Sequence, residues 1–174
     1  MDNKCTRPSI RPASENDITA IAHLIQLAYK DVARRFGLTP ENCPKHPSNC
    51  TDAWIRSDLE RAVTYFLLVH DNTLIGCAAL ETSDPSVAYL MRLAVLPEFR
   101  RRGFGEMLVQ HIISQARQLA MSSISIGLIA EQEELAAWYG NLGFIPGETK
   151  RFEHLPFTVL YMTYPLLPDA PESI

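Results

Sequence analysis

The sequence predicts an α/β fold in which a mixed β-sheet carries helices on its faces. Two β-rich runs, residues 65–69 and 74–80, are separated by a short polar turn at residues 71–73, which indicates an antiparallel hairpin. A strand, a helix and another strand then follow each other between residues 87 and 128, and this β-α-β order implies parallel strands. With 174 residues, 47% of them hydrophobic, the chain can bury one core and is short for two domains.

A short strand and an amphipathic helix are expected at the start of the chain. Residues 9–11 are the candidate strand. Ser14 and Asp17 form a capping-box-like helix start, and apolar residues follow at helical spacing. The helix is expected to end at Gly37, because glycine tolerates the positive φ of a helix C-cap.

Proline and helix signals divide the rest of the chain. Three prolines within residues 38–50 exclude a continuous helix or a central strand, so a loop is expected there. A second helix, capped by Thr51 or Asp52, follows with an apolar side made of Trp54, Ile55, Leu59 and Ala62. The remaining expectations are a strand at 87–95, a helix over 104–119, a strand at 124–128, a helix over 133–141, a closing strand at 158–163 and a loosely held tail over 165–174.

Composition argues against several classes of partner. Lys plus Arg number 16 and Asp plus Glu number 20, and the net charge of -4 does not favour nucleic acid or anionic lipid. No apolar run approaches the roughly 18 residues that span a bilayer, and the first residues lack the apolar core of a signal peptide, so a soluble cytoplasmic protein is expected. The cysteines at positions 5, 43, 50 and 77 are too scattered for a disulfide framework, so reduced thiols are expected.

The run Arg100-Arg101-Arg102-Gly103-Phe104-Gly105 lies between a predicted strand and the first turn of a predicted helix. A helix N-terminus leaves backbone N–H groups unpaired and carries about half a positive charge, so it suits a phosphate. The glycines let the backbone approach the anion closely. A P-loop would need Gly-Lys-Ser/Thr here, and a dinucleotide fingerprint would need a small residue in place of Leu108, so neither motif fits.

This run resembles the central motif of the GNAT family of N-acetyltransferases, whose pattern is Arg/Gln-x-x-Gly-x-Gly/Ala after a strand. Arg100, Gly103 and Gly105 carry the resemblance. Residues 137–144 resemble a second family segment, aromatic-Tyr-x-x-x-Gly-Phe, about thirty residues on. The two segments lie at the separation usual in the family, and the order of predicted elements agrees over most of the chain.

The resemblance implies an acetyl-CoA-dependent N-acetyltransferase without a metal. It implies one domain at residues 8–167, a strongly twisted mixed sheet flanked by helices on both faces, and a loosely ordered tail at residues 168–174. In the family, backbone amides of the turn hold the coenzyme A pyrophosphate, and the main chain of the preceding strand pairs with the pantetheine arm. The implied cofactor-binding residues are Leu93, Ala94, Val95, Arg100, Arg101, Arg102, Gly103, Phe104, Gly105, Glu106 and Gln132.

The resemblance also implies that Tyr139 is the general acid. A tyrosine with a pKa near 10 is protonated at pH 7 and can protonate the departing thiolate. An acceptor ammonium has no free lone pair, so a base must take its proton. Many relatives carry a glutamate on the strand before the turn, where this chain has Tyr89. Glu81 and His46 are the candidate bases, and the ordinary interpretation of either is a surface group.

The loop from Cys43 to Cys50 contains two thiols and the His46 imidazole, which suggests a zinc site. Three ligands from one loop do not complete a structural site, so the loop is instead expected to shape the pocket of the acceptor, a small-molecule or peptide amine. Dimers are common in the family, and a homodimer is one expected assembly. Two other functions stay open: a module that binds acyl-CoA without turnover, and a toxin that acetylates charged tRNA, which the net charge disfavours.

Overall fold

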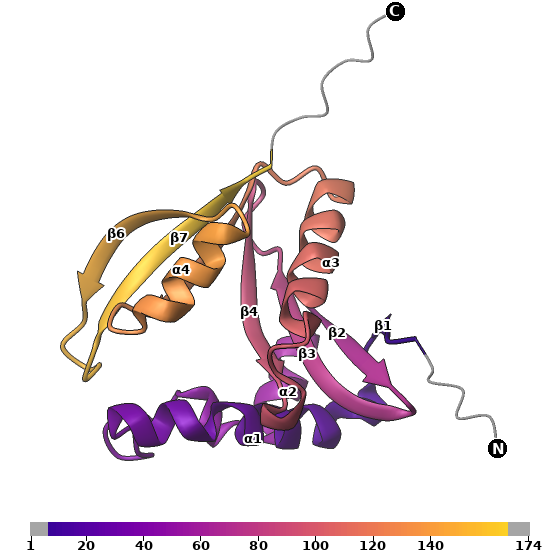
Figure 1. Ribbon diagram of the computed structural model, residues 1–174, viewed down its shortest axis with the longest axis horizontal. Coiled ribbons are helices and arrows are strands. Elements are labelled where there is room, and N and C mark those ends of the chain that lie inside the picture. Colours follow the sequence, from indigo (N-terminus) through magenta and orange to yellow (C-terminus); the bar gives the residue numbers. More distant parts are fainter. Residues whose placement is uncertain (1–6, 167–174) are drawn as a thin grey trace, which may run out of the picture.

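The computed structural model describes residues 7–166 and contains one seven-stranded sheet in the order β1-β2-β3-β4-β5-β7-β6 (Figure 1). The expected mixed sheet is confirmed, because β4 and β5 pair parallel and the other neighbours pair antiparallel. The elements are β1 (Ser9–Pro12), η1 (Glu15–Asp17), α1 (Ile18–Phe36), η2 (Pro47–Asn49), α2 (Asp52–Glu60), β2 (Val63–His70), β3 (Thr73–Glu81), β4 (Val87–Val95), η3 (Pro97–Phe99), α3 (Phe104–Gln118), β5 (Ser123–Ile129), α4 (Glu133–Asn141), β6 (Ile145–Arg151) and β7 (Thr158–Pro165), where η marks a short 3-10 helix.

Helices cover both faces of the sheet, as expected. In β2, Tyr65 and Leu67 are buried among residues of α1 and α2, whereas Phe66 and Leu68 are buried among residues of α3 and α4. Successive side chains of a strand point to opposite faces, so one strand contributes to two cores. No helix among residues 7–166 is both long and apolar enough to cross a membrane.

The sheet opens between β4 and β5. Only three residue pairs join the two strands, Val87 with Ser123, Ala88 with Ile124 and Tyr89 with Ser125. Beyond these pairs β4 continues beside β3, and β5 continues beside β7. The two strands therefore separate over the second half of their length, and Figure 1 shows β4 and β7 diverging toward α1.

Local signals fix the ends of the first helix and the first hairpin. The Asp17 carboxylate accepts hydrogen bonds from the Ser14 amide at 2.8 Å and the Ser14 hydroxyl at 3.1 Å. Gly37 ends α1 with φ +61°, as expected of a C-cap glycine. Asp71 and Asn72 form the hairpin turn with φ +48° and +59°, the backbone sign that a type I′ turn requires at both positions.

The C-terminal end of the sheet contains one unexpected strand and one wrong expectation. Strand β6 is not expected from its sequence because all seven residues are exposed and show no apolar alternation; main-chain pairing with β7 holds it at the sheet edge. Pro165 belongs to β7, where it lies opposite Ser123, and not to a tail. A proline fits there because it is the last residue of the strand. The tail expected at residues 168–174 lies outside the described residues.

Helix α2 is shorter than expected. It ends at Glu60, so Ala62 is not on its apolar side. The backbone of Arg61 is extended, and the Ala62 carbonyl accepts a hydrogen bond from the Thr82 amide at 2.9 Å. Main-chain pairing with the residue after β3 therefore replaces helical hydrogen bonding after Glu60.

Candidate active site

A cavity of about 470 Å³ lies where β4 and β5 separate. Its lining comes from both strands, from the end of β3, from α1, from the loop before α2, from α4 and from β7. Except for a few polar side chains, the lining is apolar, which is typical of a small-molecule site. The expected catalytic residues Tyr139, Glu81 and His46 all line this cavity, together with Gln132 and Leu93.

The turn at Arg100–Gly105, called the phosphate turn below, has an open backbone. Gly103 is the N-cap of α3 with φ +81°, and no side chain caps the helix. The amides of its first turn therefore have no side-chain partner and are available to an anion. A Cβ at Gly105 would lie 3.3 Å from Cζ2 of Trp138, so the second glycine allows close packing of α3 against α4. The two sequence segments that carry the family resemblance are thus in contact.

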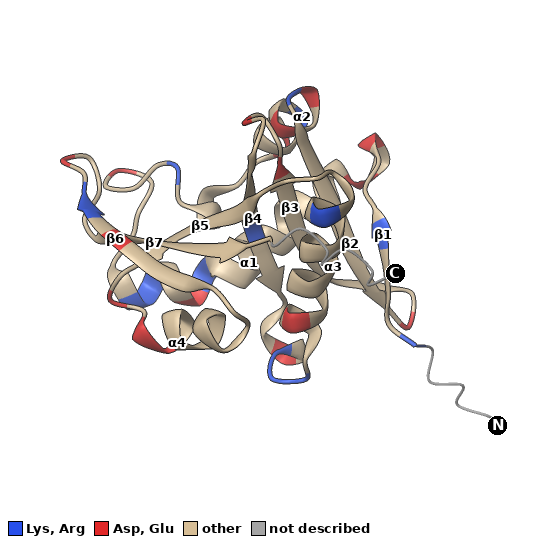
Figure 2. Cartoon of the chain, turned by 90° about the horizontal axis from the view of Figure 1, so that it is seen from above, with Lys and Arg blue, Asp and Glu red and all other residues tan. Residues whose placement is uncertain are grey.

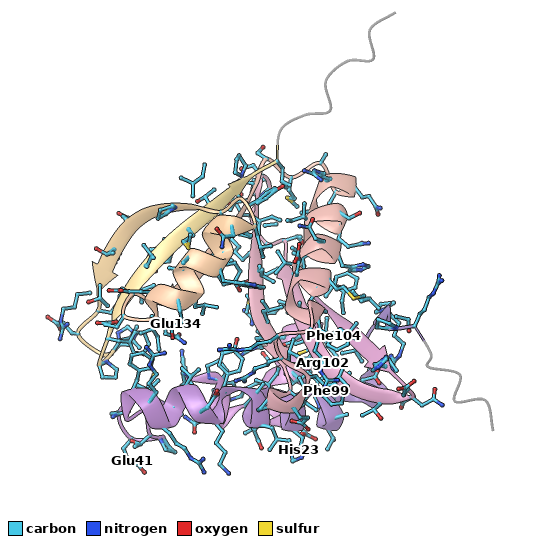
Figure 3. The ribbon with its side chains drawn as sticks, viewed as in Figure 1. His23, Glu41, Phe99, Arg102, Phe104 and Glu134 are labelled. Carbon is cyan, nitrogen blue, oxygen red and sulfur yellow. The ribbon has the colours of Figure 1, made fainter. Side chains whose placement is uncertain are left out.

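The three arginines of the turn have different surroundings. The Arg100 guanidinium bonds the carbonyls of Val95 and Ala28 at 3.1 and 2.5 Å and the carboxylate of Asp31 at 2.5 Å, so it ties the turn to α1. Arg102 lies with its Cζ 5.6 Å from the centre of the Phe99 ring, at the start of α3 (Figure 3). The run forms the basic turn before α3 in Figure 2. Arg100 therefore positions the backbone of the turn, whereas Arg102 presents its charge outside it.

The part of β4 that faces the opening contains an irregularity. The register with β3 shifts between Cys77 and Ala79, and Arg92 in β4 has φ +49°. The Leu93 carbonyl accepts a hydrogen bond from the hydroxyl of Tyr29 at 2.8 Å. Burial raises the pKa of Tyr29, so this hydroxyl stays protonated and keeps donating at neutral pH. Nothing in the helical spacing of Tyr29 marks this contact with β4 in the sequence.

Tyr139 combines packing with access to the cavity. Only 6% of the residue is exposed, and its ring packs edge-on against Trp138 and Phe144 at centroid distances of 4.9 and 5.2 Å. Its hydroxyl makes no hydrogen bond to any of residues 7–166, although Tyr139 lines the cavity. Burial raises its pKa, so the phenol is protonated at neutral pH. The hydroxyl therefore keeps its proton and can donate a hydrogen bond to a group in the cavity.

His46 is buried, and its interpretation as an ordinary surface group is wrong. It is 6% exposed because the loop folds back and packs η2 beside α1, with the imidazole 5.8 Å from the Tyr29 ring. Nδ1 of His46 accepts a hydrogen bond from the Ser48 amide at 3.3 Å and lies 2.8 Å from the Ser48 hydroxyl. An imidazole that accepts at Nδ1 carries its proton on Nε2, and burial lowers its pKa, so the ring is neutral. His46 is thereby a hydrogen-bond donor through Nε2.

Glu81 is the other candidate base. It lies at the end of β3 opposite Tyr89, with a side chain that is 20% exposed. Its carboxylate accepts from the Ser83 hydroxyl at 3.2 Å and lies 3.9 Å from Nη1 of Arg61. Both contacts leave the carboxylate with free acceptor capacity.

A buried polar cluster behind β4 has no counterpart in the sequence analysis. Asp58 of α2 is 2% exposed. Its Oδ2 accepts from the Tyr65 hydroxyl at 2.6 Å and from Nε of Arg92 at 3.0 Å, and its Oδ1 accepts from Nη2 of Arg61 at 2.5 Å. The four residues come from three elements and a helix end, so no local spacing could reveal them.

One thiol of the described residues contacts this cluster, since Sγ of Cys77 donates to the Arg92 carbonyl at 3.6 Å. Cys43, Cys50 and Cys77 are free and buried, and Cys43 lies in a different apolar cluster from Cys50. Burial raises the pKa of Cys50 to about 11, so its thiol is protonated. Within residues 7–166 no group of three or more His, Cys, Asp or Glu could hold a metal ion.

Contacts across the opening join the two parts of the sheet at the end of α1. Ala33 and Leu38 pack with Ile129 of β5 in one buried cluster, which also contacts Phe157. Arg35 of α1 forms an ion pair with Glu134 of α4, and Glu134 lies between the two helices in Figure 3. The cavity is therefore bounded at this end by side chains from both sides.

Comparison with known proteins identifies acetyltransferases. A family model described as the Acetyltransferase (GNAT) family matches residues 22–144. An amino-acid acetyltransferase of Neisseria meningitidis (serogroup A, strain Z2491) is 33% identical over 152 residues, which are 86% of this chain and 29% of that protein. The chain thus spans less than a third of the length of this curated relative.

Two solved structures have the same fold. The ribosomal-protein-S18-alanine N-acetyltransferase from Escherichia coli superposes with a TM-score of 0.75 at 18% identity, covering 97% of this chain and 99% of that one. The N-acetylglutamate synthase from Neisseria gonorrhoeae, complexed with coenzyme A and N-acetyl-glutamate, gives a TM-score of 0.66 at 24% identity, covering 95% of this chain and 36% of that one.

Proposed function

Because this chain belongs to the GNAT family of acetyltransferases, we propose that it transfers an acetyl group from acetyl-CoA directly to a primary amine of a small molecule or peptide. One observation carries the proposal: the uncapped phosphate turn and the cavity that contains Tyr139 are joined through the contact of Gly105 with Trp138. A phosphate site and a proton donor thereby lie on the two sides of the opening between β4 and β5.

Acetyl-CoA fits the groups that are available. The amides at the start of α3 would hold the pyrophosphate, supported by the charges of Arg101 and Arg102. The main chain from Leu93 to Val95, which has no β5 partner, would pair with the pantetheine arm. The Tyr29 hydroxyl already donates to one lone pair of the Leu93 carbonyl oxygen. Leu93 would therefore bind the arm through its amide or through the second lone pair of that oxygen. Acetyl-CoA would supply the activated acyl group as a thioester.

The chemistry follows from three of the polar side chains that line the cavity, Tyr139, Glu81 and His46. The amine lone pair attacks the thioester carbonyl carbon, the C–N bond forms and the C–S bond breaks. The Tyr139 hydroxyl gives its proton to the departing thiolate, and the proton that the amine nitrogen loses passes to Glu81 directly or through water. Exchange with solvent then returns a proton to Tyr139 and removes the proton from Glu81. His46 donates a hydrogen bond from Nε2 to the amine substrate. Its Nδ1 is not available for this contact, because it already accepts a hydrogen bond from the Ser48 amide.

Amino acids are the first acceptors to test, because the curated relative from Neisseria meningitidis is named an amino-acid acetyltransferase. The test is release of free coenzyme A from acetyl-CoA with a panel of amino acids, polyamines and peptides, each product being identified by mass spectrometry. An N-acetylated product formed at a saturable rate supports the proposal. Tight binding of acetyl-CoA with only background thiol release would identify a non-catalytic acyl-CoA-binding module instead.

A further inference from the structure

Arg92 lines the cavity from the bulge in β4. Its φ of +49° is a conformation that residues with a Cβ rarely adopt, and bulges of this kind re-aim a side chain at a strand. The side chain is 15% exposed. It is the only Lys or Arg that lines the cavity among residues 7–166, and Glu81 is the only acidic residue there.

The guanidinium of Arg92 is fixed on two sides. Its Nε donates to Oδ2 of the buried Asp58 at 3.0 Å, and the Tyr65 hydroxyl holds the same oxygen at 2.6 Å. Its Cζ lies 5.5 Å from the centre of the Trp54 ring. A charged group held by a buried carboxylate and an aromatic ring has lost most of its freedom before any ligand arrives.

The outer edge of the same guanidinium is not used. Asp58 cannot pair with it through both oxygens, because Oδ1 accepts from Nη2 of Arg61 at 2.5 Å. No acceptor among residues 7–166 bonds Nη1 or Nη2 of Arg92. The two nitrogens form the planar pair of donors that matches a carboxylate.

From this geometry, and resting on the proposed acetyl transfer, we propose that Arg92 binds a carboxylate of the acceptor. The acceptor is then a small amino carboxylate, such as an amino acid, and not a simple amine or an amine whose carboxyl group is blocked. In a mostly apolar cavity the carboxylate finds no other cation among the described residues, so Arg92 determines specificity. The amine of the same acceptor then reacts with Glu81 and Tyr139, which line the same cavity.

The test compares each of the twenty common L-amino acids with its own carboxamide in the coenzyme A release assay. We expect kcat/KM to favour the carboxylate by about 10- to 100-fold, the range for one hydrogen-bonded charge. The amine of a carboxamide is the weaker base and is more deprotonated at neutral pH, so amine ionisation cannot produce this preference. Arg92→Lys should reduce the preference to a few-fold, and Arg92→Gln should abolish it, with acetyl-CoA affinity unchanged.

Arg61→Lys is the matched control, because Arg61 bonds the same Asp58 but is 55% exposed and does not line the cavity. It should keep the full preference. If Arg92→Gln does not fold, the double variant Arg92→Gln/Asp58→Asn removes both charges and leaves no buried unpaired ion. Equal use of carboxylate and carboxamide by the wild type, full preference in Arg92→Lys, or loss of preference in Arg61→Lys would each overturn the inference.

A binding measurement separates this inference from the proposed function. Calorimetry of the protein with coenzyme A bound, titrated with N-acetyl amino acids and their carboxamides, reports carboxylate recognition without turnover. If no amine releases coenzyme A, the proposed acetyl transfer fails. If the N-acetyl amino acids still bind better than their carboxamides and Arg92→Lys removes the difference, the carboxylate site stands. Binding that ignores the carboxylate overturns the site whatever the turnover.

Discussion

The phosphate turn and the acceptor side of the cavity are built from different parts of the chain. The turn is a short local segment whose proposed binding groups are main-chain amides, and its geometry depends on the positive φ of Gly103. The acceptor side is made of side chains from α1, the loop before α2, β3 and β4, among them His46 and Arg92. Apart from Arg100, which ties the turn to α1, we expect the turn to tolerate changes of side chain but not of backbone. We expect the acceptor side to respond to single side-chain changes. The two regions meet at Trp138 and Tyr139 of α4, since Trp138 packs at Gly105 and Tyr139 lines the cavity.

The largest effect is expected at this meeting point. Tyr139→Phe removes the proton donor and should lower kcat by about 100- to 10,000-fold, with little change in acetyl-CoA affinity. Stopped-flow thiol release and calorimetry measure the two quantities. Tyr164→Phe is the control, since Tyr164 does not line the cavity. A Tyr139→Phe protein with wild-type kcat would make Tyr139 a packing residue and leave the two regions without a shared catalytic group.

A backbone change in the turn tests the first half of the comparison. Gly103→Val forces a β-branched residue to φ +81° and should weaken acetyl-CoA binding by roughly 10- to 100-fold. Gly37→Val places the same residue at φ +61° at the end of α1, where a Cβ also has open space. The control should lose comparable stability and keep its affinity. Unchanged affinity in folded Gly103→Val, measured by calorimetry, would refute the assignment of the turn.

A side-chain change in the acceptor region tests the second half. His46→Ala removes the Nε2 donor and should raise the acceptor KM by about tenfold or less, the value of one hydrogen bond, while acetyl-CoA affinity stays the same. His23→Ala is the matched control, because His23 is an exposed histidine of α1. If His46→Ala has wild-type kinetics with every accepted amine, the loop is only a scaffold.

The smallest effect concerns α3 behind the turn. His111 packs against Phe66 at a centroid distance of 4.6 Å, and its buried Nε2 has no partner among the described residues. Burial lowers its pKa, so the unfolded chain takes up a proton below about pH 6.5 before the folded protein does. The stability contributed by neutral His111 is complete above that pH and falls as the pH drops.

His111→Phe should therefore raise the free energy of unfolding by about 1 kcal/mol at pH 7.5, and by more at pH 5.5. Urea titrations at the two pH values measure the change. Affinity for acetyl-CoA should stay constant, since the turn depends on its own backbone. A changed affinity would show that the turn is coupled to the packing of the whole helix.

The sequence predicts most elements where local signals are strong. Helix α4 has the expected bounds because Gly143 and a run of helix formers delimit it, and Gly37 ends α1 as expected. Strand β6 escapes prediction because tertiary pairing, and not an apolar pattern, makes it a strand. The phosphate turn is also predictable, because the glycines and arginines that define it are neighbours in the sequence.

The acceptor side is not predictable in this way. Arg92 and Asp58 are 34 positions apart, and their contact depends on a bulge that nothing in the strand sequence Val87–Val95 marks. The burial of His46 depends on how a proline-containing loop packs on α1. Side chains brought together by long-range packing leave no spacing signal in the sequence.

The three residue pairs between β4 and β5 have a mechanical consequence. They are the strand pairing that connects the four strands β1 to β4 with the three strands β5, β7 and β6. Beyond Tyr89, the edge of β4 that faces β5 has no neighbouring strand. A pantetheine arm, which carries two amide groups, would serve as a partial strand filling the wedge. Binding at 100 times Kd would add about 2.7 kcal/mol to the folded state. We expect the bound molecule to restrict motion of the two parts of the sheet relative to each other. Release of the cofactor and thermal unfolding of the protein should then occur in one transition.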